Sequence, residues 1–469
     1  MKASRRIAAC ALVAAALPLA SARAFAQPAA SACASQDSPD ARIAACTAII
    51  AANTETPQNI AAAFAHRGIA YRQKGDDTHA LADFEAAIAR DPGNAAAFTG
   101  RGALYSQRGD YDRAIADLSE AIRLAPSSSH ALTDRGIAYQ KKQDYDRALA
   151  DHSAAIRLDA NDAVAFTDRG ILYLALQDND RAIADFSAAI RLAPKNAAAF
   201  AGRGTAHQEK QEYDQALADY DEAVRLDPND ATAFHGRGAV HLKRRDYDRA
   251  IADLSEAIRL APRSSSAFAS RASAYQGTQD AARALADYDE AIRLDPNNAT
   301  TFTGRGALHL ARRDYDRAIA DLGEAVRLAP GSPQTYVNRG VAYRGKQDYT
   351  RALADYGEAL RLDPNDAGAL YNRGGAYLRL HDYDHAIADL NATIRLAPKN
   401  AAAFAYRGIA YLAKRDYDRA LADYDAAIAL DPTNALAFDG RGTTYQAKGD
   451  MARANADFEE ARKLARPAP

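Results

Sequence analysis

Apolar side chains recur along the chain at spacings of three and four residues, and the whole pattern of apolar and polar positions returns every 34 residues. Twelve copies follow one another without an insertion or a deletion, and positions 1 to 34 are counted from the first residue of each copy. A fixed period of this length is typical of stacked helical repeats. The copies cover residues 61–94, 95–128, 129–162, 163–196, 197–230, 231–264, 265–298, 299–332, 333–366, 367–400, 401–434 and 435–468.

Each copy has the pattern of two helices joined by a tight turn. In the second copy, the spacing predicts a helix over residues 95–108 that Gly109 ends, and Asp110 can cap a second helix over 111–124. Pro126 prevents that second helix from continuing. Position 8 is glycine in eleven copies and position 20 is alanine in all twelve, so two small residues let the helices approach closely. The pattern therefore predicts an all-α fold of antiparallel helix pairs.

The residues that recur in each copy resemble those of the tetratricopeptide repeat, and the resemblance covers residues 61–468. In the second copy the matching residues are Phe98 at position 4, Gly102 at 8, Tyr105 at 11, Ala114 at 20, Leu118 at 24, Ala121 at 27 and Pro126 at 32. The resemblance implies a right-handed superhelical α-solenoid of twelve helix pairs. It also implies that the first helices line a concave groove, where positions 2, 5, 9, 12 and 13 meet an extended peptide or a partner helix.

The resemblance gives a set of candidate partner-binding residues at positions 5, 9 and 12. They form a small, mildly apolar and nearly uncharged groove. The leucines among them have a second interpretation, which is packing between neighbouring helices, because periodicity does not separate the two roles. The candidates are Thr99, Ala103, Thr133, Ile137, Thr167, Ile171, Leu174, Thr205, His235, Leu242, Thr303, Leu310, Val337, Val341, Leu378 and Leu412.

One departure from the family is systematic. Position 7, where the family usually has leucine, is arginine in all twelve copies, and position 23 is aspartate in all twelve. A partly desolvated arginine without a carboxylate is costly, so we predict a ladder of ion pairs within or between adjacent copies. The alternative is that these arginines form a row that binds anions.

Composition limits the chemistry that the chain can perform. The 469 residues carry a net charge of -2, which argues against a nucleic-acid partner because a phosphate-binding surface needs a basic excess. No cofactor is expected, and every residue of the mature chain belongs to a repeat or a cap, which leaves no room for a catalytic domain. His381 and His385 have a spacing that could hold a metal ion, but no third ligand is evident.

Residues 1–26 have the pattern of a secretory signal peptide, with an apolar stretch over 7–20 that is too short for a membrane span. We expect cleavage before Gln27 and a mature chain in the periplasm or outside the cell, without an integral membrane segment. Arg5-Arg6 leaves a twin-arginine export signal as the alternative. Cys10 has no apolar stretch ahead of it, which argues against a lipid anchor.

Residues 27–60 are expected to form an N-terminal cap. An oxidising compartment favours a disulfide between Cys33 and Cys46; the alternative is a buried Cys46 and a loose thiol at Cys33. Residues 37–52 resemble the second helix of a missing copy, followed by a lengthened turn over 53–59. At the other end, Asn455 and Arg462 replace the apolar residues of positions 21 and 28, as the end of a solenoid requires.

Three classes of function remain open. The first is a non-catalytic scaffold that binds a peptide or a helical protein partner in the concave groove. The second is a self-assembling structural protein, which leaves a homo-oligomer open. The third is a helper of envelope or secretion machinery with a polymer client, which rests on analogy with exported members of the family alone.

Overall fold

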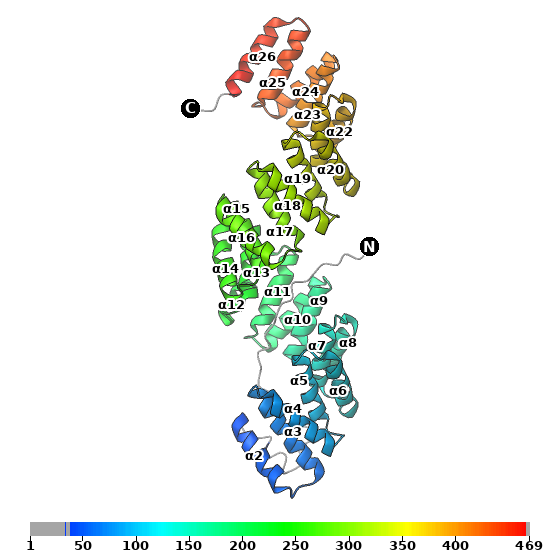
Figure 1. The fold of residues 1–469 in the computed structure, drawn as a ribbon, viewed down its shortest axis with the longest axis vertical. Helices are drawn as coiled ribbons and strands as arrows, with labels where there is room; N and C mark the ends of the chain where they lie inside the picture. The colour runs from blue at the N-terminus through cyan, green and yellow to red at the C-terminus, as the bar shows by residue number, and fades with distance from the viewer. Residues whose placement is uncertain (1–32, 34–37, 466–469) are drawn as a thin grey trace. The chain divides into compact units, whose positions relative to one another are not determined.

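The computed structural model describes Cys33 and residues 38–465, and the regular structure of this part is helical throughout (Figure 1). The expected signal peptide lies outside the described residues. Helix α2 (Pro39–Ala52) precedes the repeats, and each copy then supplies a first and a second helix. The pairs are α3 (Pro57–Gln73) and α4 (Asp77–Arg90), α5 (Ala95–Gln107) and α6 (Tyr111–Leu124), α7 (Ser129–Lys141) and α8 (Tyr145–Leu158), α9 (Ala163–Ala175) and α10 (Asn179–Leu192), α11 (Ala197–Glu209) and α12 (Tyr213–Leu226), α13 (Ala231–Lys243) and α14 (Tyr247–Leu260), α15 (Ser265–Gly277) and α16 (Ala281–Leu294), α17 (Ala299–Ala311) and α18 (Tyr315–Leu328), α19 (Pro333–Gly345) and α20 (Tyr349–Leu362), α21 (Ala367–Arg379) and α22 (Tyr383–Leu396), α23 (Ala401–Ala413) and α24 (Tyr417–Leu430), and α25 (Ala435–Ala447) and α26 (Met451–Leu464).

The described residues divide into two compact units, the first ending at Arg244 and the second beginning at Arg245. Within each unit, successive helices pack against one another, and each first helix also contacts the first helix of the next copy. Among the described residues, second helices make no such contact with one another. First helices therefore lie closer together than second helices, which curves each unit with the first helices on the inner side. The predicted all-α solenoid of stacked helix pairs is confirmed.

The two helices of a copy approach closely at the small residues that the sequence indicated. A Cβ atom at Gly102 would lie 2.7 Å from Cγ of Leu118 and 3.2 Å from the carbonyl oxygen of Ala114. Both distances are too short for a carbon contact without a shift, so glycine at position 8 makes room for the side chain at position 24. The packing reason predicted for this glycine is confirmed.

The turn between the two helices has its sharpest backbone at position 15. Gly109 has φ 81 and Asp110 caps the next helix, since its side chain accepts a hydrogen bond from the backbone N–H of Arg113. In many copies, however, a larger residue occupies the same left-handed conformation, which normally favours glycine. These residues are Gln143, Gln177, Gln211, Arg245, Gln279, Arg313, Gln347, His381 and Arg415.

The predicted ladder of ion pairs is present, and its arginines also form hydrogen bonds to the preceding copy. Arg135 donates from Nε and Nη2 to the two carboxylate oxygens of Asp151, each at 2.8 Å, and from Nη1 to Oγ of Ser119 at 3.0 Å. The aspartate belongs to the same copy and the serine to the preceding copy. Each such guanidinium therefore ties its own helix pair together and, where position 25 carries an acceptor, joins two copies. The same bidentate pair connects Arg67 to Asp83, Arg101 to Asp117, Arg169 to Asp185, Arg203 to Asp219, Arg271 to Asp287, Arg305 to Asp321, Arg339 to Asp355, Arg373 to Asp389, Arg407 to Asp423 and Arg441 to Asp457.

The N-terminal cap is held by a disulfide between Cys33 and Cys46, whose Cα atoms are 5.0 Å apart and whose side chains are fully buried. Helix α2 packs against α3. The turn after α2 is shorter than the expected 53–59, because α3 already begins at Pro57. Thr56 caps α3 by accepting a hydrogen bond from the backbone N–H of Asn59, and proline is favoured in the first turn of a helix.

The last described helix has the polar surface that the sequence predicted. Asn455 and Arg462 on α26 are exposed, whereas the equivalent Leu421 and Ile428 on α24 are partly buried. Ile428 packs against the buried cluster that includes Tyr424.

Candidate partner-binding face

The inner side of each unit is formed by the first helices, and it carries the residues that were expected to meet a partner. Most of them have partly exposed side chains, which leaves them accessible to a ligand. These are Thr99, Ala103, Ile137, Ile171, Leu174, Thr205, His235, Leu242, Thr303, Leu310, Val341, Leu378 and Leu412.

Three of the expected residues are buried instead, with exposed fractions of 4% for Thr133, 7% for Thr167 and 6% for Val337. The hydroxyl of Thr133 donates to the carboxylate of Asp162 at 3.2 Å. The hydroxyl of Thr167 accepts from the amide nitrogen of Asn196 at 3.0 Å. Hydrogen bonds to the last residue of a copy therefore draw these threonines into the interior.

The leucines at position 12 are both packed and accessible. Leu174, Leu310, Leu378 and Leu412 are each partly exposed, and each also packs against a buried cluster beneath it. The two interpretations left open by the sequence are therefore compatible. One side of each leucine contributes to the interior and another faces solvent on the inner side of its unit.

Sequence reasoning missed position 6, which decides how adjacent copies fit together. The ring of Phe186, at position 24, lies against Gly202 at position 6 of the next copy, where a Cβ atom would be 2.4 Å from the ring. A leucine at position 24 is followed by a larger residue, as with Leu254 and Ser270. Comparing position 24 of one copy with position 6 of the next would have revealed this size matching, from which His152 with Asp168 and Tyr356 with Asn372 depart. Rings lie against glycine in the same way in the pairs Phe84 and Gly100, Tyr220 and Gly236, Tyr288 and Gly304, and Tyr424 and Gly440.

Acidic groups that the candidate residues did not include lie on the first unit. Burial raises the pKa of Asp168 to about 7, and the nearby charges of Asp162 and Asp134 raise it as well. Burial also raises the pKa of Asp134 to about 6, against the opposing effect of Arg72. Among the described residues, Oδ2 of Asp168 is buried without a hydrogen-bond partner. The groove of this unit is therefore less uniform than the expected mildly apolar surface.

A second group of unusual residues lies on the first helices α19, α21 and α23 of the second unit, and we call it the Arg344 patch: Arg344, Tyr371, Gly375 and Tyr406. The rings of Tyr371 and Tyr406 are stacked, with centroids 5.1 Å apart and planes at 23°. A Cβ atom at Gly375 would lie 3.1 Å from the Tyr406 ring and 3.8 Å from Nη1 of Arg344. Burial and the neighbouring Tyr406 raise the pKa of Tyr371, while the charge of Arg344 lowers it.

The histidines are accounted for by packing and by local hydrogen bonds. Nδ1 of His381 lies 2.9 Å from the hydroxyl of Tyr383, and Nδ1 of His385 lies 2.8 Å from a carboxylate oxygen of Asp382. No cluster of three or more histidine, cysteine, aspartate or glutamate side chains suited to a metal ion occurs in the part of the chain that the structure describes. His152 is fully buried, and burial lowers its pKa to about 4.

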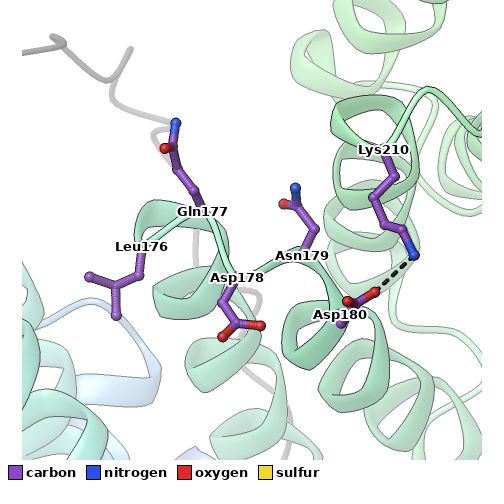
Figure 2. Close-up of a pocket in the computed structure, with 6 residues that line it drawn as sticks. All are labelled: Leu176, Gln177, Asp178, Asn179, Asp180 and Lys210. Atoms are coloured by element: carbon purple, nitrogen blue, oxygen red, sulfur yellow. Dashed lines mark hydrogen bonds and ion pairs between the residues drawn. The ribbon is translucent and has the colours of Figure 1, made fainter.

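A shallow pocket lies at the turns rather than on the inner face (Figure 2). Leu176, Gln177, Asp178 and Asn179 line it, and Nζ of Lys210 donates to Asp180 across it at 2.8 Å. The contact repeats a Lys–Asp pair that joins successive turns elsewhere, such as Lys448 with Asp418 at 2.5 Å. The pocket therefore belongs to the ion pairs that connect turns. Within residues 38–465, no helix combines the length and the apolar character needed to cross a membrane.

The stacked helix pairs and their partly exposed inner face define a helical-repeat scaffold for protein interaction. Models of the tetratricopeptide repeat match residues 66–367 in eight overlapping segments, then residues 340–407 and 401–434. The chain therefore belongs to the tetratricopeptide repeat family. No curated protein matches the chain at a significant level.

Several solved structures resemble the chain. The complex of Cut9 with Hcn1 from the APC/C has a TM-score of 0.50 and 16% identity, over 89% of this chain and 96% of that chain. Yeast Tom70 has a TM-score of 0.37 and 19% identity, over 87% and 92%. YrrB, described as a TPR protein with an unusual peptide-binding site, has a TM-score of 0.37 and 25% identity, over 42% and 97%. At this level of identity, the likeness to Cut9 concerns the fold alone.

Proposed function

We propose that the protein is a non-catalytic scaffold that holds a peptide or a helical segment of a partner protein against the inner face of its first helices. The observation that carries this proposal is the set of partly exposed apolar side chains at position 12 on the inner side of each unit, Leu174 and Leu242 in the first unit and Leu310, Leu378 and Leu412 in the second. Such side chains offer apolar surface at regular intervals, and an amphipathic helix or an extended segment can cover them. A net charge of -2 makes a nucleic-acid partner unfavourable.

The scaffold is further proposed to act in the periplasm or outside the cell. Residues 1–26 have the pattern of a signal peptide, and a disulfide joining Cys33 to Cys46 suits an oxidising compartment. Expression of the full chain in an export-competent bacterium, followed by N-terminal sequencing of the periplasmic product, tests this. A product that begins near Gln27 supports export. A full-length product retained in the cytoplasm contradicts it.

The binding proposal is tested by combining Leu242→Lys with Leu310→Lys. The double variant should lose partners captured from a periplasmic extract by crosslinking, because charges replace apolar contacts, while its circular dichroism stays unchanged. A matched control places the same two charges on Leu176 and Leu380, which lie in turns and are 46% and 45% exposed. Equal capture by both double variants would show that the partner binds elsewhere. A mass that rises with concentration in light scattering would favour self-assembly.

A further inference from the structure

The Arg344 patch is the place where the second unit departs most from its own repeat. Position 12 is glutamine or leucine in most copies, and within the second unit it is arginine at Arg344 alone, as it is at Arg72 in the first copy. No other copy has tyrosine at position 5 or 6, or glycine at position 9, yet Tyr371, Tyr406 and Gly375 occupy these positions. The four residues come from three different copies and still lie together. In a chain that otherwise repeats itself, such a concentration of exceptions indicates a local role that the other copies do not share.

The glycine explains how the patch is assembled. A Cβ atom at Gly375 would approach the Tyr406 ring to 3.1 Å, so the bare backbone of α21 lets this ring lie across the helix. Tyr371 stands four residues before Gly375, one turn away on the same helix, and stacks on the same ring. Nη1 of Arg344, which belongs to α19, lies 3.8 Å from the same Cβ position. The patch is therefore a guanidinium group beside a fixed pair of aromatic rings.

The side chain of Arg344 makes no hydrogen bond to any residue that the structure describes, unlike the residue at the same position of another copy. In the fifth copy, the same position is Gln208, which accepts a hydrogen bond from the hydroxyl of Tyr220 at 3.1 Å. Arginine has no acceptor. The corresponding hydroxyl, that of Tyr356, is buried without a partner among the described residues. Arg344 therefore leaves the hydroxyl of Tyr356 without the acceptor that Gln208 gives to Tyr220.

The charge of Arg344 also lacks a counterpart. The side chain is partly buried, and it makes no hydrogen bond or ion pair with any residue that the structure describes. The position-7 arginines, by contrast, each hold a carboxylate, as Arg373 does with Asp389 at 2.7 Å. A partly desolvated guanidinium without an anion is unfavourable, so the site is suited to an anion supplied from outside.

The surroundings define which anion fits. One guanidinium neutralises the single charge of a carboxylate, whereas a phosphate group carries nearly two charges at neutral pH. The two tyrosines add neutral ring surface and hydroxyl donors but no further positive charge. Partly exposed Val341, Leu378 and Leu412 lie on the same three helices and extend the apolar surface on either side. The complementary ligand is a carboxylate flanked by apolar groups.

We propose that the Arg344 patch binds an acidic side chain of a partner polypeptide, with the carboxylate on Arg344 and a neighbouring apolar residue on the tyrosine pair. This assignment rests on the proposed function, since it names the chemistry of the segment that the scaffold holds. Glutamate or aspartate next to an aromatic or aliphatic residue is the recognised feature. Removal of a charge-assisted hydrogen bond from a partly desolvated site should lower the affinity for the partner roughly ten- to a hundred-fold.

A random dodecapeptide library displayed on phage and selected on the full chain tests the proposal. Selected peptides should share an acidic residue beside an apolar one. In fluorescence anisotropy with synthetic copies, Arg344→Gln should weaken binding at least ten-fold, and replacing the peptide acid by its amide should weaken binding to the wild-type chain equally. Arg344→Gln should fold normally, because glutamine is the residue of position 12 in other copies.

The matched control is Arg379→Gln, which removes the same charge from an exposed position on α21 and should change affinity less than two-fold. Peptides that bind Arg344→Gln as tightly as the wild type, or that lack an acid, would overturn the assignment and leave the proposed scaffold intact. Tighter binding of a phosphoserine version would overturn the choice of a carboxylate. A failure to select any peptide would count against both the assignment and the proposed function.

Discussion

The ring of Phe186 lies directly against the backbone of Gly202, which belongs to the next copy along the chain, and a Cβ atom at Gly202 would come within 2.4 Å of the ring. Gly202→Ala should therefore destabilise the first unit by about 1–3 kcal/mol, because the ring is fully buried and has little room to move. The midpoint of urea unfolding, followed by circular dichroism, measures the change.

Gly357 provides the control for this substitution. It lies within α20, and nothing stands within 4 Å of a Cβ placed there, so Gly357→Ala should stabilise the helix by about 0.5–1 kcal/mol. Adding Phe186→Leu to Gly202→Ala should recover stability, since leucine at position 24 tolerates a larger residue at position 6. Equal effects of the two alanine substitutions would refute the size matching.

The ion pair between Arg373 and Asp389 allows a second prediction. Asp389→Leu should cost about 3–5 kcal/mol, because it leaves the partly buried Arg373 without its carboxylate. The double change with Arg373→Leu should recover most of that loss, since no charge then remains to be desolvated. Unfolding midpoints of the two single variants and the double variant form the test. A double variant as unstable as Asp389→Leu would mean that the pair itself, rather than the uncompensated charge, stabilises the fold.

His152 gives a prediction with a definite pH window. Its pKa is lowered to about 4 in the folded chain, against 6.5 for the free side chain, so the unfolded chain takes up the proton first as the pH falls. Stability is therefore lost between about pH 6.5 and pH 4, by roughly 1.4 kcal/mol per pH unit. His152→Leu, which places at position 24 the residue found in other copies, should remove this loss.

The measurement is the difference in unfolding free energy between His152→Leu and the wild type at several pH values. The difference should grow as the pH falls from 6.5 to 4 and stay constant above 7. Asp168 acts in the opposite direction, because a pKa raised to about 7 costs stability as the pH rises from about 4 to 7. Its contribution should cancel in the comparison. A difference that does not change with pH would show that the pKa of His152 is the same in the folded and the unfolded chain.

The left-handed turn residues supply the last prediction. Gln143 has φ 62, a conformation that costs a non-glycine residue about 1 kcal/mol, and Gly109 and Gly449 already occupy the same position in other copies. Gln143→Gly should therefore stabilise the first unit by about 0.5–1 kcal/mol. Gln140→Gly, within α7, should destabilise it by about 1 kcal/mol. The midpoints of thermal unfolding of both variants test this prediction. A loss of stability in Gln143→Gly would contradict the view that the backbone of Gln143 is strained.

The 34-residue period was enough to predict almost every helix. Residues 95–108 and 111–124 were expected, and α5 and α6 occupy Ala95–Gln107 and Tyr111–Leu124. Boundaries followed so closely because the same caps and turn residues recur in each copy. The early start of α3 was missed, since Thr56 and Pro57 have no counterpart in the other copies.

The candidate face was harder to predict, because its character depends on contacts between copies. The sequence predicts that the threonines at position 5 all face a partner, yet Thr133 is buried and Thr99 is partly exposed. The difference comes from Asp162, which hydrogen-bonds Thr133 from the end of the copy. The Arg344 patch was missed for the same reason: its residues occupy different positions of three copies, and only the stack brings them together.

The pairing of position 24 with position 6 of the following copy also limits how the array can be shortened. Excision of residues 197–230 would place Phe186 against Gly236, where a ring already fits beside a glycine. Excision of residues 95–128 would place Phe84 against Asp134 in place of Gly100, and that junction should be less stable. Copies that look interchangeable therefore differ in the neighbours that they fit, and the array should lose a member at least cost where the two sizes still match.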